Sequence, residues 1–283
     1  MGRSNALHAF QSRQTVAPER SSSAISPEGS MRICSTITPA SIVVTAMRFR
    51  PQNLRETDPV TFDRLVQNNP YLAKVHDYPE LLLPYPTPEQ FQALWKPKTK
   101  AVQRVHLEIG CGSGRYLSQW AAHFPEDAFL GFELRFKRIT LAAKKLQRNE
   151  QSNALLLRER GEFFDDYLQP GTLDVLHVNF PDPWPKQGHA KHRLLSQEFL
   201  TRLHPYFHPK GEVRFKTDHL DYFDWVSETF ASLPRYHVTA HTRHLQASPH
   251  AEGNTATEFE LLFRSKGDPP IGFLIAEVEP EQG

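Results

Sequence analysis

The chain has 283 residues, 39% of them hydrophobic, which is enough for one large α/β domain or two small ones. Its 33 basic and 32 acidic side chains leave a net charge of +1, which excludes a globally basic nucleic-acid-binding protein and restricts such binding to local patches. No apolar run reaches the roughly 18 residues of a membrane span, so we expect no membrane contact. Two distant cysteines, Cys34 and Cys111, exclude a disulfide framework and fit a reducing, cytoplasmic compartment.

The N-terminal part differs in composition from the rest. Residues 1–46 are rich in Ser, Arg and Thr and lack sustained periodicity, so we predict a disordered extension without a catalytic role. A transit peptide, or a translation start at Met47, are the alternatives. The proline density of residues 47–103 predicts an irregular lead-in with short helices at 59–67 and 87–95, followed by one domain over residues 104–283.

A glycine-rich turn opens that domain. Residues 104–109 are typical of a short strand, Gly110, Gly112 and Gly114 follow, and an apolar-periodic helix is predicted over 115–124. Glycines in this context let the chain turn sharply and let a ligand approach the backbone. The third glycine of a dinucleotide-binding motif is missing, and so is a phosphate-binding loop, which disfavours a pyrophosphate site.

Two further strands are predicted to end in charged residues. The strand at 128–134 ends near Glu133, a carboxylate placed either to bind the hydroxyls of a ribose or to favour the start of the next helix. That helix, over residues 135–150, is rich in Lys and Arg, which we expect on its solvated face. The third strand, at 154–160, ends in Glu159 and Arg160.

The stretch 173–193 combines a buried strand, a stiff loop and positive charge. The strand at 173–180 is broken by three prolines within residues 181–185, which hold Asp182 and Trp184. Open α/β sheets bind ligands at such strand ends. The alternative is a surface turn before a solvated basic helix start. Trp184 is equally consistent with stacking on a base and with packing under the loop.

The remaining pattern completes an α/β fold. We predict helices at 192–207 and 220–233, a turn at 209–211 and a strand at 212–216. Two β-type runs, at 235–242 and 257–264, are predicted to pair as a hairpin across the polar loop 243–256. The fold class is therefore α/β, a doubly wound, mostly parallel seven-stranded sheet whose last strand is a candidate for antiparallel pairing.

Four motifs occur in order: Glu108–Gly114, Phe180–Lys186, Lys216–Asp218 and Thr257–Glu260. Over roughly residues 104–265 the chain thereby resembles the bacterial tRNA (guanine-N7-)-methyltransferases. The resemblance implies a Rossmann-like methyltransferase fold, S-adenosylmethionine as cofactor and tRNA as partner. It also implies N7-methylguanosine formation in the variable loop, by a monomer or weak homodimer.

The resemblance also assigns roles to residues of this chain. The implied cofactor-binding residues are Glu108, Gly110, Gly112, Glu133, Glu159, Arg160 and Asp182, with Asp182 also the central catalytic carboxylate. The implied substrate-binding residues are Lys186, Asp218, Thr257, Glu258, Phe259 and Glu260. Two departures stand out. Arg160, with Glu159 beside it, occupies the place of an adenine-contacting Asp, and residues 188–193 carry two arginines fewer than the family pattern, which weakens a phosphate patch.

The chemistry expected of such a site is simple. Guanine N7 has a free lone pair, so Asp182 is not needed as a strong base and is expected to accept hydrogen bonds and stabilise positive charge. No metal is expected, because neither of two candidate groups, Asp182 with His189 and His192, and His241 with His244 and His250, is completed by a Cys or Glu at familiar spacing. A methyltransferase acting on another base or a small molecule, and a non-catalytic RNA-binding protein, are the alternative hypotheses.

Overall fold

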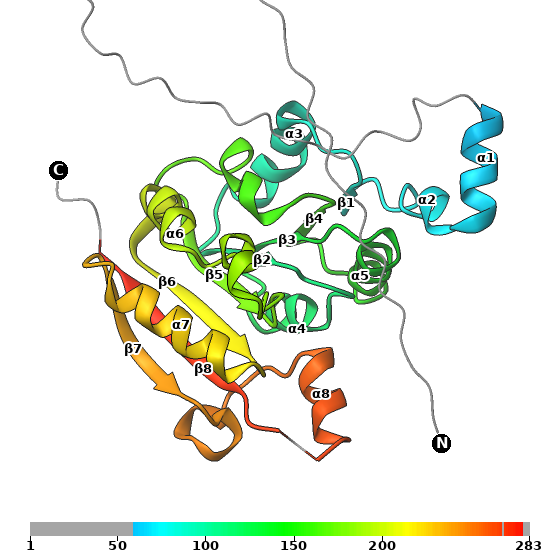
Figure 1. Ribbon diagram of the computed structural model, residues 1–283. Coiled ribbons are helices and arrows are strands. Elements are labelled where there is room, and N and C mark those ends of the chain that lie inside the picture. The colour runs from blue at the N-terminus through cyan, green and yellow to red at the C-terminus, as the bar shows by residue number, and fades with distance from the viewer. Residues whose placement is uncertain (1–58, 268, 280–283) are drawn as a thin grey trace, which may run out of the picture. The chain divides into compact units, whose positions relative to one another are not determined.

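The computed structural model describes residues 59–267 and 269–279, so the predictions for residues 1–46 lie outside the described residues. One mixed sheet carries the fold, in the strand order β1-β4-β3-β2-β5-β6-β8-β7 (Figure 1). The strands are β1 (Leu82–Leu83), β2 (Val105–Ile109), β3 (Ala128–Phe132), β4 (Ala154–Leu157), β5 (Leu173–Asn179), β6 (Phe207–Thr217), β7 (Tyr236–Thr242) and β8 (Gly272–Val278). Pairing is parallel from β1 to β6 and antiparallel from β6 through β8 to β7.

Helices cover both faces of this sheet (Figure 1). They are α1 (Pro59–Asn68), α2 (Tyr71–Lys74), α3 (Pro88–Lys98), α4 (Arg115–His123), α5 (Phe136–Arg148), α6 (Gln197–Leu203), α7 (Leu220–Ala231) and α8 (Glu258–Arg264). Short 3-10 helices are η2 (Gly161–Asp166), η3 (Gln187–His192), η4 (His204–Tyr206), η5 (Leu245–Ala247) and η6 (Pro249–Ala251). The doubly wound α/β prediction is confirmed.

The two faces of the sheet differ in chemistry. On one face, Leu107 and its neighbours on β3 to β6 pack against α3, α6 and α7 in a large apolar core. On the other face, α4 and α5 cover a smaller apolar cluster over β3 and β4. Because side chains alternate along a strand, His106 and Glu108 of β2 and His177 of β5 point to this second face. These buried polar side chains of the sheet therefore lie beneath α4.

The end of the chain corrects the predicted hairpin. Residues 258–264 form a helix, α8, because the Thr257 side chain accepts a hydrogen bond from the Glu260 backbone N–H and caps it. The strand that pairs with β7 is β8, for which the sequence analysis assigned no element. With the two-residue β1 at the opposite edge, the sheet has eight strands and not the predicted seven.

Two further boundaries were wrong. The helix predicted from residue 192 begins at Gln197, because Arg193 is extended and Ser196 caps α6 by accepting a hydrogen bond from Phe199 N–H. Strand β6 begins at Phe207 and not at Glu212. The predicted turn around Lys210, whose φ is +69°, is an irregularity inside β6, where the pairing with β5 shifts register.

Candidate functional site

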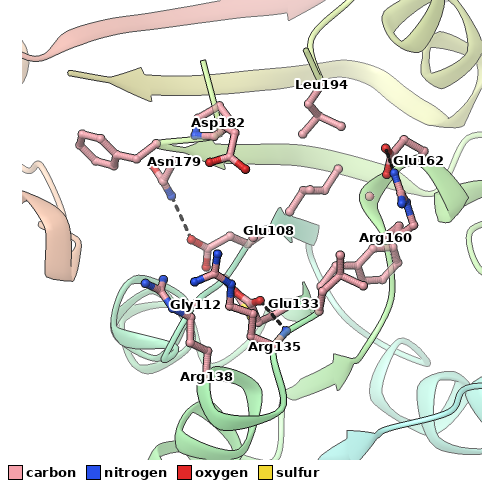
Figure 2. A pocket seen from close by; sticks show the side chains of 18 of the residues that line it. Glu108, Gly112, Glu133, Arg135, Arg138, Arg160, Glu162, Asn179, Asp182 and Leu194 are labelled. Carbon is pink, nitrogen blue, oxygen red and sulfur yellow. Dashed lines mark hydrogen bonds and ion pairs between the residues drawn. The ribbon is translucent and has the colours of Figure 1, made fainter. Parts of the chain in front are cut away.

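A cleft of about 1050 Å³ lies at the carboxyl ends of β2, β3, β4 and β5, with the start of α5 and of α8 on its sides. This is where open α/β sheets bind ligands. In Figure 2, Asn179 and Asp182 lie on one side of Glu108, and Glu133 and Arg135 lie on the other. Three carboxylates from three different strand ends therefore face one hollow.

Glu108 forms the floor of the cleft and is 4% exposed. Its Oε1 accepts a hydrogen bond of 3.0 Å from Asn179 Nδ2, whereas its Oε2 is buried and has no partner among the described residues. Burial raises the pKa of Glu108 to about 7, against the opposing effect of the Asn179 bond. A buried carboxylate oxygen without a donor is costly, and such an atom is suited to a ligand that brings a donor.

The glycine turn beside Glu108 has the conformation that its sequence predicts. Gly110 has φ +79°, and a Cβ there would meet no atom within 4 Å, so its backbone is open to the cleft. Gly114 has φ +73°, and a Cβ there would lie 2.7 Å from the Ala142 Cβ of α5. The first glycine therefore leaves room for a ligand, and the last lets α4 and α5 pack closely.

The carboxylates at the next two strand ends are in different states. Glu133 lines the cleft, and within the described part of the chain its carboxylate accepts only one hydrogen bond, at Oε1 from the Arg135 backbone N–H at 2.8 Å. Glu159 is buried, and both of its oxygens accept hydrogen bonds, from the Arg160 backbone N–H at 2.8 Å and from Tyr167 OH at 3.0 Å. The Arg160 side chain forms an ion pair with Glu162 at 2.9 Å. Glu133 is thus available to a ligand, whereas Glu159 is fully engaged.

The loop after β5 presents Asp182 to the cleft. Asp182 is exposed, and its side chain accepts no hydrogen bond from residues 59–267 or 269–279. Phe180 and Trp184 on either side have φ values of +51° and +43°, which non-glycine residues rarely adopt. Strained backbone of this kind persists where the surroundings fix it, and it clusters at functional sites. Trp184 is 37% exposed and lines the cleft, while its ring also packs against His189 and His192 at centroid distances of 5.8 and 5.2 Å.

A buried ion pair fastens the segment before α8 to the sheet. Lys216 Nζ of β6 donates to Glu260 Oε1 at 2.9 Å, to Asn254 Oδ1 at 2.6 Å and to the Thr255 carbonyl at 3.0 Å. Asn254 Nδ2 in turn donates to Glu260 Oε2 at 2.9 Å. The charged groups of Lys216 and Glu260 are therefore fully engaged within this cluster of hydrogen bonds. Glu260 acts as an anchor that leaves Phe259, 39% exposed, on the cleft.

Glu258 links α8 to the glycine turn. Its Oε1 accepts hydrogen bonds from Ser113 Oγ at 2.9 Å and from Lys145 Nζ of α5 at 3.0 Å. The start of α8 is thereby held against the glycine turn that follows β2 and against helix α5, which follows β3. Of the predicted substrate-binding residues, Thr257, Glu258 and Phe259 line the cleft, whereas Lys186, Asp218 and Glu260 do not.

A chain of buried hydrogen bonds that the sequence analysis missed lies behind the glycine turn. Asp127 Oδ2, His106, His177 and Tyr116 OH are joined by three contacts of 3.0 Å each. Burial lowers the pKa of His106 to about 3 and that of His177 well below its usual range, so both rings are neutral. A carboxylate can only accept, so each ring donates from Nε2 and accepts at Nδ1, and Tyr116 donates to His177. The signal was a histidine in the interior of each of two adjacent, largely apolar strands.

Two negative findings concern only the part of the chain that the structure describes. Within residues 59–267 and 269–279, no helix is long and apolar enough to cross a membrane. No group of three or more His, Cys, Asp or Glu side chains in these ranges is arranged to hold a metal ion. Cys111 is free and buried, and Cys34 lies outside the described residues.

Known proteins resemble the chain over this same region. Residues 102–271 match the model of a family described as "Putative methyltransferase". A tRNA (guanine-N(7)-)-methyltransferase of Enterococcus faecalis is 32% identical over 210 residues, covering 71% of this chain and 93% of that protein. One of Lachnoclostridium phytofermentans is 36% identical over 194 residues, covering 69% and 90%.

Two other relatives place the likeness in context. A bifunctional glycosyltransferase/methyltransferase of Fusobacterium nucleatum is 36% identical over 207 residues, 73% of this chain, and the match spans about a third (32%) of that protein. Among solved structures, the 16S rRNA methyltransferase KamB matches with a TM-score of 0.51 at 16% identity, covering 66% of this chain and 94% of that one. This last likeness shows the fold alone.

Proposed function

We propose that this chain, which belongs to the family of tRNA (guanine-N(7)-)-methyltransferases, transfers a methyl group from S-adenosylmethionine to N7 of a guanine in tRNA. We further propose that this guanine lies in the variable loop, as the sequence motifs imply. The observation that carries the proposal is the cleft, which has a buried, half-satisfied Glu108 on its floor and an exposed Asp182 at its mouth.

The residues of the floor fit the cofactor. Glu108 Oε2 lacks a donor, and the amino group of S-adenosylmethionine would supply one. The open backbone at Gly110 leaves room for the methionine part, and the free Oε2 of Glu133 would accept from a ribose hydroxyl. Bound there, the cofactor supplies an electrophilic methyl group on a sulfonium. Glu159 has no free oxygen, so we assign it to fixing the Arg160 backbone and not to direct contact with adenine.

The residues of the mouth fit a guanine. Asp182 has no hydrogen-bond partner among the described residues, so both of its oxygens are available to the N–H edge of the base. Methylation places a positive charge on the ring, and a carboxylate held nearby stabilises that charge more in the transition state than in the ground state. Trp184 and Phe259 line the cleft with part of each ring exposed, so an unstacked base that enters the mouth would contact their rings. No general base is required, because N7 carries no proton.

The test is methyl transfer from labelled S-adenosylmethionine to unmodified tRNA, with the product mapped by cleavage at N7-methylguanine. We expect label at a single guanine with the wild type, and its loss with Asp182→Ala. Asp221→Asn is a matched control, because Asp221 is exposed on α7 and does not line the cleft. Label on another base or only on a small molecule would contradict the proposed substrate, and failure to bind S-adenosylmethionine would contradict the enzyme itself.

A further inference from the structure

One side of helix α5 carries positive charge only. We call Lys137, Arg138, Lys144, Lys145 and Arg148 the α5 basic face. With 3.6 residues per turn these five positions fall within an arc of about 120°, opposite the buried positions of the helix. The helix contains no Asp or Glu between Phe136 and Arg148. From the sequence we expect a solvated face, yet a solvated helix face normally carries charges of both signs.

The charges of this face are hardly compensated. Lys145 pairs with Glu258, and the Arg138 guanidinium lies 5.7 Å from the centre of the Phe259 ring. Lys137, Lys144 and Arg148 are exposed and form no ion pair within the described ranges 59–267 and 269–279. Like charges at i and i+4, such as Lys144 and Arg148, destabilise a helix by a few tenths of a kcal/mol. Arg148 lies in the last turn of α5, where the helix dipole favours a cation and offsets this cost, but the dipole does not account for Lys137 and Lys144. A helix face with several cations and no acid is expected where an anionic partner uses it.

The α5 basic face is continuous with the cleft. Lys137 and Arg138 line the cleft itself, and Figure 2 shows Arg138 on the same side as Glu133. Lys144 and Arg148 continue along the helix, so the face extends about 16 Å from Lys137 at a rise of 1.5 Å per residue. A partner that occupies the mouth of the cleft therefore meets this face directly.

Other cations around the cleft are engaged within the protein. The Arg193 guanidinium donates to the Pro183 carbonyl at 3.0 Å and lies 4.8 Å from the centre of the Trp225 ring. Arg160 pairs with Glu162, and Arg202 pairs with Asp165 at 3.0 Å. Two exposed cations that line the cleft lie outside the α5 basic face, Lys191 of η3 and Arg135 at the N-cap of α5. Most of the uncompensated positive charge is thus on α5.

We propose that the α5 basic face binds the phosphate backbone of the RNA strand that leads to the target guanine. This inference rests on the proposed function, because it takes the partner in the cleft to be tRNA. Phosphate contacts fix the register of a nucleic acid without reading its sequence, and exposed Lys and Arg side chains suit that role. A base must be splayed out to reach the cleft, so the flanking backbone has to be held separately.

The test is equilibrium binding of unmodified tRNA across a salt series, for the wild type and Lys144→Gln/Arg148→Gln. These two residues are exposed and lie outside the cleft, so the fold and the site are left intact. Losing two phosphate contacts lowers the slope of log K against log salt by about 1.4–1.8 and weakens binding roughly tenfold near physiological salt. The affinity for S-adenosylmethionine is expected to stay within about twofold.

The matched control is Lys96→Gln/Lys100→Gln. Both lysines are exposed, and α3 packs on the opposite face of the sheet from α5, so slope and affinity should match the wild type. An unchanged salt slope in the α5 variant, with tRNA still methylated, would overturn this inference alone. If the α5 variant shows a reduced slope but the wild type binds tRNA without ever methylating it, the result would support this inference and contradict the proposed reaction. Binding to anionic lipid vesicles is measured for the same proteins. If the α5 variant lost vesicle binding but bound tRNA as the wild type does, the inference would be overturned in favour of a membrane surface.

Discussion

The two walls of the cleft are built in different ways. The wall that we assign to the cofactor comes from one continuous stretch, from Glu108 through the glycine turn to Glu133. The wall that we assign to the base combines the loop around Asp182 with α8, and a buried Lys216–Glu260 pair fastens α8 to β6. Local sequence determines the glycine turn of the first wall, although Asn179 of β5 positions its Glu108. The second wall depends throughout on hydrogen bonds between distant segments.

Breaking the anchor of the second wall should cost the most. Lys216→Met leaves the Glu260 carboxylate, 1% exposed, without its charge partner. We expect the free energy of unfolding in urea at pH 7 to fall by about 3–5 kcal/mol. The double variant Lys216→Met/Glu260→Leu should recover most of that loss, because no charge is left buried. A single-variant loss below about 1 kcal/mol would show that the pair does not anchor α8.

The histidine chain behind the first wall should make the protein sensitive to acid. The pKa of His106 is lowered to about 3 and that of His177 lies well below its usual range, whereas both titrate near 6.5 in the unfolded chain. Below pH 6.5 the unfolded state therefore binds protons that the native state excludes, and stability falls as pH falls. The expected slope approaches about 2.7 kcal/mol per pH unit for the two residues.

Urea unfolding at pH 7, 6 and 5 measures this slope. His106→Gln should reduce it by about half, whereas His123→Gln, at an exposed position, should leave it unchanged. If the free energy of unfolding changed equally with pH in the wild type and in His106→Gln, His106 would not be held neutral in the native state.

Cofactor binding should depend on the ionisation of Glu108. Burial raises its pKa to about 7, and the cofactor's ammonium group binds the carboxylate and not the protonated acid. We expect the Kd for S-adenosylmethionine, measured by calorimetry, to fall about tenfold between pH 6 and pH 8. Glu108→Gln should bind more weakly, with no such dependence. A wild-type Kd that is constant over this range would show that Glu108 does not face the amino group.

The smallest effect is expected at the cap of α8. Thr257→Ala removes the side-chain oxygen that accepts from Glu260 N–H at 3.1 Å, and should lower the free energy of unfolding by about 1 kcal/mol. Thr201→Ala is the control, because Thr201 is exposed within α6 and caps nothing. Equal effects of the two substitutions would indicate that the cap does not define the start of α8.

The structure of the first wall could be predicted from the sequence further than that of the second, because the two walls depend to different degrees on distant segments. The glycines at 110, 112 and 114, with a strand before and a helix after, specify a turn that needs no distant partner. The run 257–264 is short and apolar, a pattern that fits either a strand or a helix. It is helical because Thr257 caps it and because Glu260 pairs with Lys216, which lies 44 residues earlier in the chain. Motif resemblance therefore identified residues of the second wall whose structure could not be predicted.

Side-chain roles were the least predictable feature. Glu260 was expected to contact the substrate, but it is buried against Lys216. Asn179, which positions Glu108, lies at the end of an apolar strand where nothing in the sequence distinguishes it. Such pairings depend on register between β2 and β5, which a pattern of hydrophobic residues does not fix to the level of single atoms.

The separation of the two walls can be tested directly by measuring cofactor affinity and methyl-transfer rate on the same two variants, Asp182→Asn and Glu108→Gln. For Asp182→Asn, we predict a Kd for S-adenosylmethionine within about twofold of the wild type and a transfer rate to tRNA lower by about 10²–10³. For Glu108→Gln, we predict weakened cofactor binding. If Asp182→Asn weakened cofactor binding as much as Glu108→Gln does, Asp182 would belong to the cofactor wall and the account would be wrong.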